Sequence, residues 1–158
     1  MNKIEVTKVS IYSHLLMLLT TVHHIYGAII YNTPWRFHVV FISIPVIIII
    51  AISGRSIFKK ESNRKSFWFW VYWSIILIAS IGFFGLFEGI YNHLLKDILF
   101  YSGVNREVLF QLFPPPKYEM PNDFLFEATG VLQAVLAILL IIHFIRLTKS
   151  AMLRTTLR

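Results

Sequence analysis

Four long apolar runs divide the chain and limit its possible folds more than any other feature. A helix needs about 20 consecutive apolar residues to cross the hydrocarbon core of a bilayer. The runs cover approximately residues 9–31, 37–53, 67–101 and 124–147. Hydrophobic residues make up 56% of the sequence, which is more than an ordinary soluble domain contains. We therefore predict an all-α integral membrane four-helix bundle, with residues 1–158 forming one transmembrane domain.

Residues that break or cap helices separate these runs. Pro45 lies inside the second run, where a kink is tolerable in a membrane. The third run is longer than one span, so we expect its helix to extend past the membrane before an outer loop at 103–123. Within that loop, residues 106–113 have the pattern of a short amphipathic surface helix. Asn122 or Asp123 is expected to cap the fourth helix.

The distribution of Lys and Arg predicts the orientation. Most basic residues lie near the N-terminus, between the second and third runs, or near the C-terminus. The opposite side holds only Arg36, Lys96, Arg106 and Lys117. The positive-inside rule makes both termini cytoplasmic, and we predict a multi-pass protein of the cell (plasma or inner) membrane. The net charge of +7 does not indicate nucleic-acid binding, because the charges gather at span ends.

Polar and ionisable residues concentrate at one level, near the outer ends of all four spans. Such side chains are costly inside a membrane and by default mark a functional site. The residues are His23, His24, His38, Glu88, Asn92, His93, Lys96 and Glu127. On the fourth span, Gly130 and Ala134 form a small-x-x-x-small pattern on the face of Glu127, which predicts close contact with another helix. The pattern predicts a polar pocket that opens outward.

A transition-metal site is the leading functional hypothesis. Imidazoles and carboxylates from different helices are common ligands of zinc, iron and copper. His24 and His93 are the first candidate ligands, with His23 and His38 next. Glu88 or Glu127 would be a ligand or general base, and Asn92 and Lys96 would orient an anionic group. The predicted protein is a small membrane enzyme that acts near the outer leaflet on a lipid or another apolar substrate.

The same residues leave other functions open. Glu88 and His93 are five residues apart and, on an α-helix, span an arc of about 140°. They therefore lack the i, i+3 spacing of di-iron bundles. Haem bound by His24 and His93 is an alternative, and His14 and His143 would supply a second tier of ligands for a second haem. Metal-free acid–base chemistry and a proton path also use buried carboxylates and histidines.

A non-enzymatic membrane subunit is the main alternative to an enzyme. Its polar cluster would serve helix packing or partner binding. A homo-oligomer or a partner subunit is compatible with either hypothesis. The chain has no cysteine, which excludes disulfides, thiolate zinc sites and iron–sulfur clusters.

Overall fold

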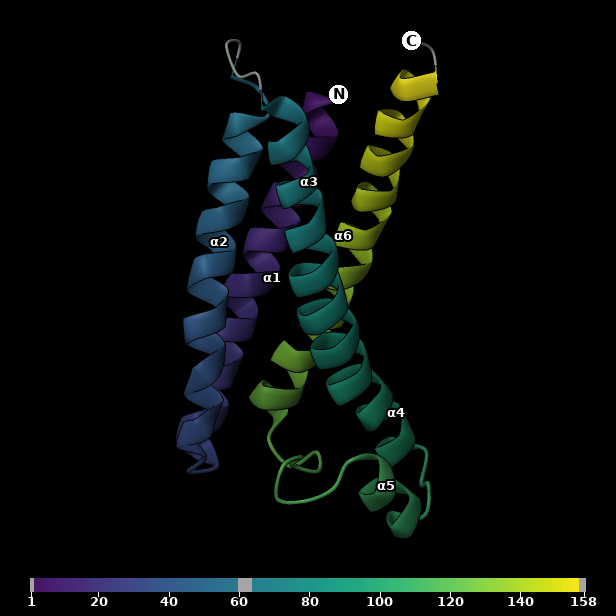
Figure 1. Ribbon diagram of the computed structural model, residues 1–158. Coiled ribbons are helices and arrows are strands. Elements are labelled where there is room, and N and C mark those ends of the chain that lie inside the picture. The colour runs from purple at the N-terminus through teal and green to yellow at the C-terminus, as the bar shows by residue number, and fades with distance from the viewer. Residues whose placement is uncertain (1, 60–63, 157–158) are drawn as a thin grey trace.

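The computed structural model describes residues 2–59 and 64–156, and every regular element within these ranges is helical (Figure 1). In chain order the elements are α1 (Lys3–Ile30), the 3-10 helix η1 (Pro34–Phe37), α2 (His38–Ser56), α3 (Lys65–Ile75), the π-helix η2 (Ile76–Leu95), α4 (Lys96–Tyr101), α5 (Arg106–Leu112) and α6 (Phe124–Thr156). The elements α3, η2 and α4 follow one another without a break and form one long helical segment.

Four helical segments are long and apolar enough to cross a membrane, as the sequence predicts. They are Lys3–Ile30, Pro34–Ser56, Lys65–Tyr101 and Phe124–Met152. Both termini lie at the same end of the molecule, together with the end of α2 and the start of α3 (Figure 1). We call this the terminal end and the opposite end, where α1 ends and α6 begins, the distal end. Insertion in a bilayer and the cytoplasmic position of the termini stay predictions.

Side-chain caps fix the start of several helices. Asp123 accepts a hydrogen bond from the backbone N–H of Phe126 at 2.8 Å, which confirms the predicted cap of α6. Asn2 caps α1 in the same way. Asn105 caps α5, the helix predicted for the outer loop. The loop of residues 102–123, which we call the distal loop, therefore enters α6 at a defined residue, which fixes the position of the first turn of α6.

Close approach of α6 to η2 brings the polar residues together. The two helices cross and make the most extensive helix contact in the described structure (Figure 1). A Cβ on Gly89 would lie 2.9 Å from the backbone nitrogen of Ala134, and a Cβ on Gly130 would collide with the ring of His93. The predicted contact through Gly130 and Ala134 is thus confirmed, and it leaves only enough space between the helices for the imidazole ring.

The interior is divided into an apolar part and a polar part. Buried apolar residues from all four spans, including Leu16, Ile50, Tyr72 and Leu140, form one core that extends toward the terminal end. His23, His24, His93, Lys96 and Glu127 are buried at the distal end instead. Burial of the apolar core stabilises the bundle. This stabilisation offsets the free-energy cost of burying the polar side chains at the distal end.

Candidate metal centre

The predicted polar residues converge at the distal end. They belong to three of the four spans and, in chain order, are His23, His24, Glu88, Asn92, His93, Lys96 and Glu127. Glu88 is partly exposed, and the other six residues are buried. The structure therefore brings together seven of the eight residues that the sequence singles out.

The winding of η2 explains how Glu88 and His93 face the same site. In a π-helix the backbone hydrogen bonds join residues five apart, and such segments often occur at functional sites. Glu88 and His93 are separated by five residues within η2. Their side chains approach to 3.5 Å between Glu88 Oε1 and His93 Nε2. An α-helix would place Glu88 and His93 about 140° apart, whereas in this π-helix the two side chains lie on the same face.

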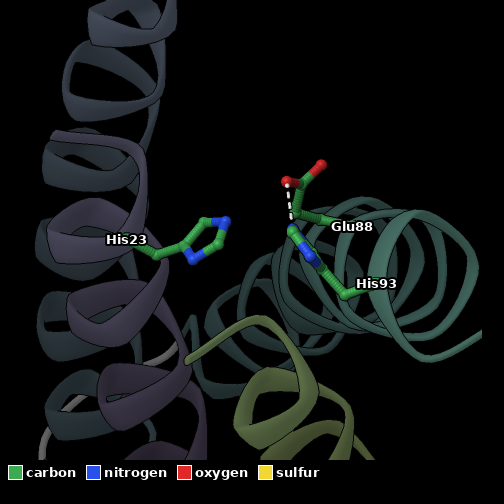
Figure 2. Close-up of side chains that lie close together, drawn as sticks. All are labelled: His23, Glu88 and His93. Carbon is green, nitrogen blue, oxygen red and sulfur yellow. Dashed lines mark ion pairs between the residues drawn. The ribbon is translucent and has the colours of Figure 1, made fainter. Parts of the chain in front are cut away.

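Three residues form a group with metal-binding geometry. One ligand atom each from His23, Glu88 and His93 lies within 4.8 Å of the others. In Figure 2 the ring of His23 projects from α1 toward Glu88 and His93 on η2. The rings of His23 and His93 are 4.4 Å apart between centroids and nearly perpendicular. This buried group of two imidazoles and one carboxylate could bind a metal ion.

The hydrogen bonds of His23 determine which ring nitrogen faces the group. The Thr129 hydroxyl donates to the backbone oxygen of Leu125 at 2.7 Å. Its oxygen therefore accepts from His23 Nδ1–H, at 2.9 Å. A neutral imidazole with its proton on Nδ1 has its lone pair on Nε2. That nitrogen is buried and has no hydrogen-bond partner in the described part of the chain.

A carboxylate of α6 holds His93 in a similar way. Glu127 Oε2 lies 3.4 Å from His93 Nδ1, so it accepts the proton on that nitrogen and leaves Nε2 facing Glu88. Lys96 Nζ lies 3.3 Å from Glu127 Oε1 and donates to the backbone oxygen of Glu119 at 2.9 Å. A histidine ligand usually has its second nitrogen fixed by a carboxylate or another acceptor. Thr129 and Glu127 are the two residues that supply this support.

Both oxygens of Glu88 are held by neighbouring side chains. Its Oε1 lies 2.9 Å from His24 Nε2, and its Oε2 accepts a 2.7 Å hydrogen bond from Asn92 Nδ2. His24, which the sequence favours as a metal ligand, thus contacts the candidate ligand Glu88. The adjacent His23 is the α1 residue of the three-residue group. The structure places Glu88 between the two helices and restrains its carboxylate.

His38 stands apart from this group. It is exposed at the start of α2, stacks on Trp35 and has its Nδ1 2.5 Å from the backbone oxygen of Trp35. Its ring centroid is 6.3 Å from that of His24. His38 therefore lies at the edge of the site, outside the three-residue group with metal-binding geometry.

Three residues at the site were not identified from the sequence. Thr129 orients His23, Arg36 is buried beside the site, and Asp97 is buried with one oxygen lacking a hydrogen-bond partner in the described ranges. The sequence did show that Thr129 lies in the first turns of the fourth span, near the level of the other polar residues, and this could have identified it. In the sequence, Arg36 and Asp97 are charged residues near span ends. Charged residues at span ends usually relate to the orientation of the spans and not to a binding site.

A cavity of about 190 Å³ adjoins the polar residues. Its lining includes His24, Glu88 and His93, together with apolar residues of α2 and η2 and part of the distal loop. Tyr118 of that loop contributes a phenol, and burial raises the pKa of its hydroxyl. This hydroxyl stays protonated at neutral pH and is a potential donor at the cavity. The site is thus accessible to a small group from outside the helix bundle.

Comparison of the chain with protein-family models, curated proteins and solved structures found no match. The case for a function therefore depends on the geometry of the site.

Proposed function

We propose that this protein is a membrane-embedded, metal-dependent enzyme in which His23, Glu88 and His93 bind one transition-metal ion. The observation that carries the proposal is the buried Nε2 of His23, which has no hydrogen-bond partner among the described residues. Leaving such an atom unpaired costs about 1–3 kcal/mol. Coordination to a metal uses that lone pair and removes the penalty.

The donor set supports zinc as the first choice. Two imidazoles and one carboxylate form catalytic zinc sites that keep a fourth position for water, and the same set also binds non-haem Fe(II). Zinc ligands at about 2.0–2.2 Å in a tetrahedron are about 3.3 Å from one another. The 3.5 Å separation between Glu88 and His93 is close to that value. His23 would need to approach by up to about 1.5 Å to complete the set, given the 4.8 Å limit of the group.

Hydrolysis is the reaction that this centre would support without a redox partner. Zinc makes a bound water nucleophilic at neutral pH. Glu127 and Thr129 would fix the two histidines, and Asn92 and Lys96 would lie beside the metal to orient an anionic group of the substrate. The predicted orientation places the reaction in the outer half of the plasma or inner membrane, where a lipid or another apolar molecule is the expected substrate.

Metal content of detergent-purified protein tests this proposal. We expect about one zinc per chain in the wild type and loss of most of it in His23→Gln. The matched control is His143→Gln, because His143 is also buried and pairs with Glu5 at 2.9 Å in the terminal half. Equal metal content in the two variants would contradict the proposal. An absorption spectrum with a Soret band would support the haem hypothesis instead.

A non-enzymatic subunit remains the second candidate, because the ion pairs themselves connect spans. His24 joins α1 to Glu88 on η2, and Glu127 joins α6 to Lys96 on α4. Charged pairs of this kind can serve packing alone. A packing function predicts that the protein binds no metal. It also predicts lower thermal stability in Glu88→Gln and Glu127→Gln, and binding to a partner subunit.

A further inference from the structure

Arg36 is a buried cation that forms no ion pair within residues 2–59 and 64–156, although the charges of Glu119 and Glu88 act on it. Its side chain is at the distal end, and the residue is 5% exposed. Its Nε donates to Thr33 Oγ1 at 2.8 Å, and its guanidinium lies 5.0–5.5 Å from the rings of Tyr31, Trp35 and Phe126. Among the described residues no carboxylate forms an ion pair with it. The other buried cation at this end, Lys96, pairs with Glu127.

Arg36 lines the cavity next to the proposed metal centre. Two more cations line the same cavity. They are Lys96, which pairs with Glu127, and Lys117, which is exposed at the solvent side. Two acids of the lining, Glu88 and Glu119, also contribute to the charge there. Glu88 is held by His24 and Asn92. The guanidinium edge of Arg36 is therefore the available group for an external anion, and guanidinium binds phosphate or carboxylate through paired hydrogen bonds.

One side of the cavity wall is apolar and continues to the outside of the bundle. Phe83 and Phe87 of η2 line the cavity and are 49% and 40% exposed. Val39 of α2 lines it as well. Helix α2 packs on α1 and α3, and it diverges from η2 toward the distal end (Figure 1). The cavity thus lies between two helices that separate toward the distal end, next to side chains that would face lipid.

We propose that this cavity binds an anionic lipid with a phosphate headgroup. Arg36 holds the phosphate, Lys117 contacts it from the solvent side, and the acyl chains lie along Phe83 and Phe87 and extend into the bilayer. The further statement that this lipid is the substrate rests on the proposed metal centre. The statement that the lipid binds rests on the charge and shape of the cavity alone.

Binding to purified full-length protein in detergent tests the inference. The probes are dioctanoyl phosphatidic acid, dioctanoylglycerol, which lacks the phosphate, and inorganic phosphate, which lacks the chains. Native mass spectrometry counts the bound molecules. We expect one phosphatidic acid per chain. Dioctanoylglycerol should bind at least about tenfold more weakly because it loses the charge-assisted hydrogen bonds. Inorganic phosphate should bind at least about tenfold more weakly because it loses the apolar contacts of the acyl chains.

Substitutions then assign the binding to Arg36. We expect Arg36→Gln to weaken phosphatidic acid binding by about 10–100-fold. Arg106→Gln is the matched control, because Arg106 also lies over an aromatic ring, that of Phe110, but does not line this cavity. Lys117→Gln changes an exposed residue and keeps the test valid if Arg36→Gln fails to fold. Weaker binding in Lys117→Gln than in Arg106→Gln supports the inference.

Three results would overturn the inference. They are equal binding of phosphatidic acid and dioctanoylglycerol, equal binding of phosphatidic acid and inorganic phosphate, and wild-type binding in both Arg36→Gln and Lys117→Gln. His23→Gln separates this inference from the metal proposal. We expect that variant to lose zinc and to bind phosphatidic acid within about twofold of wild type, because His23 is absent from the cavity lining. Absence of zinc in the wild type would remove the metal centre and leave the lipid test intact.

Discussion

Removal of the Thr129 hydroxyl tests how the structure prepares His23 for a metal. Thr129→Val keeps the shape and β-branching of the side chain and removes one oxygen. That oxygen accepts from His23 Nδ1–H at 2.9 Å. In the variant, the ring either buries an unpaired N–H or moves its proton to Nε2, where it blocks coordination. Both outcomes oppose metal binding.

The expected magnitude follows from the lost hydrogen bond. An unpaired buried donor costs about 1–3 kcal/mol, and loss of a group that orients a metal ligand typically lowers affinity 10–100-fold. A tenfold change corresponds to about 1.4 kcal/mol, so the two figures agree. We therefore expect zinc affinity to fall by 10–100-fold, measured by competition with a chromophoric chelator on detergent-purified protein.

Thr148→Val is a closely matched control. The Thr148 hydroxyl accepts from Trp73 Nε1–H at 2.9 Å and donates to the backbone oxygen of Phe144 at 3.0 Å. The same helix therefore contains the same arrangement far from the candidate site. We expect both variants to lose similar thermal stability and only Thr129→Val to lose zinc affinity. Zinc affinities within twofold of each other would refute the proposed role of Thr129.

Three further predictions concern packing, charge and topology. Gly130→Ala would place a Cβ against the His93 ring, so we expect at least tenfold weaker zinc binding, whereas Gly54→Ala, whose Cβ would meet the Tyr72 ring at 3.4 Å, should bind normally. Glu127→Gln should lower both zinc affinity and the melting temperature, because removing one partner of a buried ion pair costs about 3–5 kcal/mol; Glu5→Gln, which disrupts the pair with His143, should lower the melting temperature alone. The chain has no cysteine, so single-cysteine variants report the membrane topology. A membrane-impermeant maleimide added to whole cells should label Ser102→Cys and should not label Ser66→Cys. The reverse pattern would contradict the predicted orientation.

The helices were predictable because their signals are local. Apolar runs of sufficient length identify the spans, and Asp123 identifies the start of α6 through capping. Gly130 and Ala134 predicted a close helix contact without naming its partner. The structure identifies η2 as that partner, with the His93 ring and Gly89 in the contact. Sequence spacing gives the face that a residue occupies, but the residue across the interface depends on the tertiary arrangement.

The details of the site depended on features that no local pattern contains. An α-helical period separates Glu88 from His93, whereas the winding of η2 brings them together. His23 and His24 point in directions about 100° apart, and α1 is covered by neighbours on both sides. His24 therefore meets Glu88 while His23 meets Thr129. Arg36 follows a proline turn and would ordinarily be exposed, but three aromatic rings surround it.

His23→Leu separates a metal centre from a packing network, because the two functions predict opposite effects on stability. A network selected for packing should pair its buried atoms. At this site His23 Nε2, His24 Nδ1, Asn92 Oδ1 and Asp97 Oδ1 have no partner within the described ranges. Leucine removes one unpaired nitrogen, a gain of about 1–3 kcal/mol, and one hydrogen bond to Thr129, a loss of about 1 kcal/mol.

With a chelator present, the melting temperature of His23→Leu should therefore equal or exceed that of the wild type. With zinc present, the order should reverse, because only the wild type gains stability from a ligand that binds the folded state. A variant that is less stable than wild type in chelator, and equally so in zinc, would show that His23 serves packing. Such a result would identify the carboxylates of the site as helix contacts and would remove the central residue from the metal hypothesis.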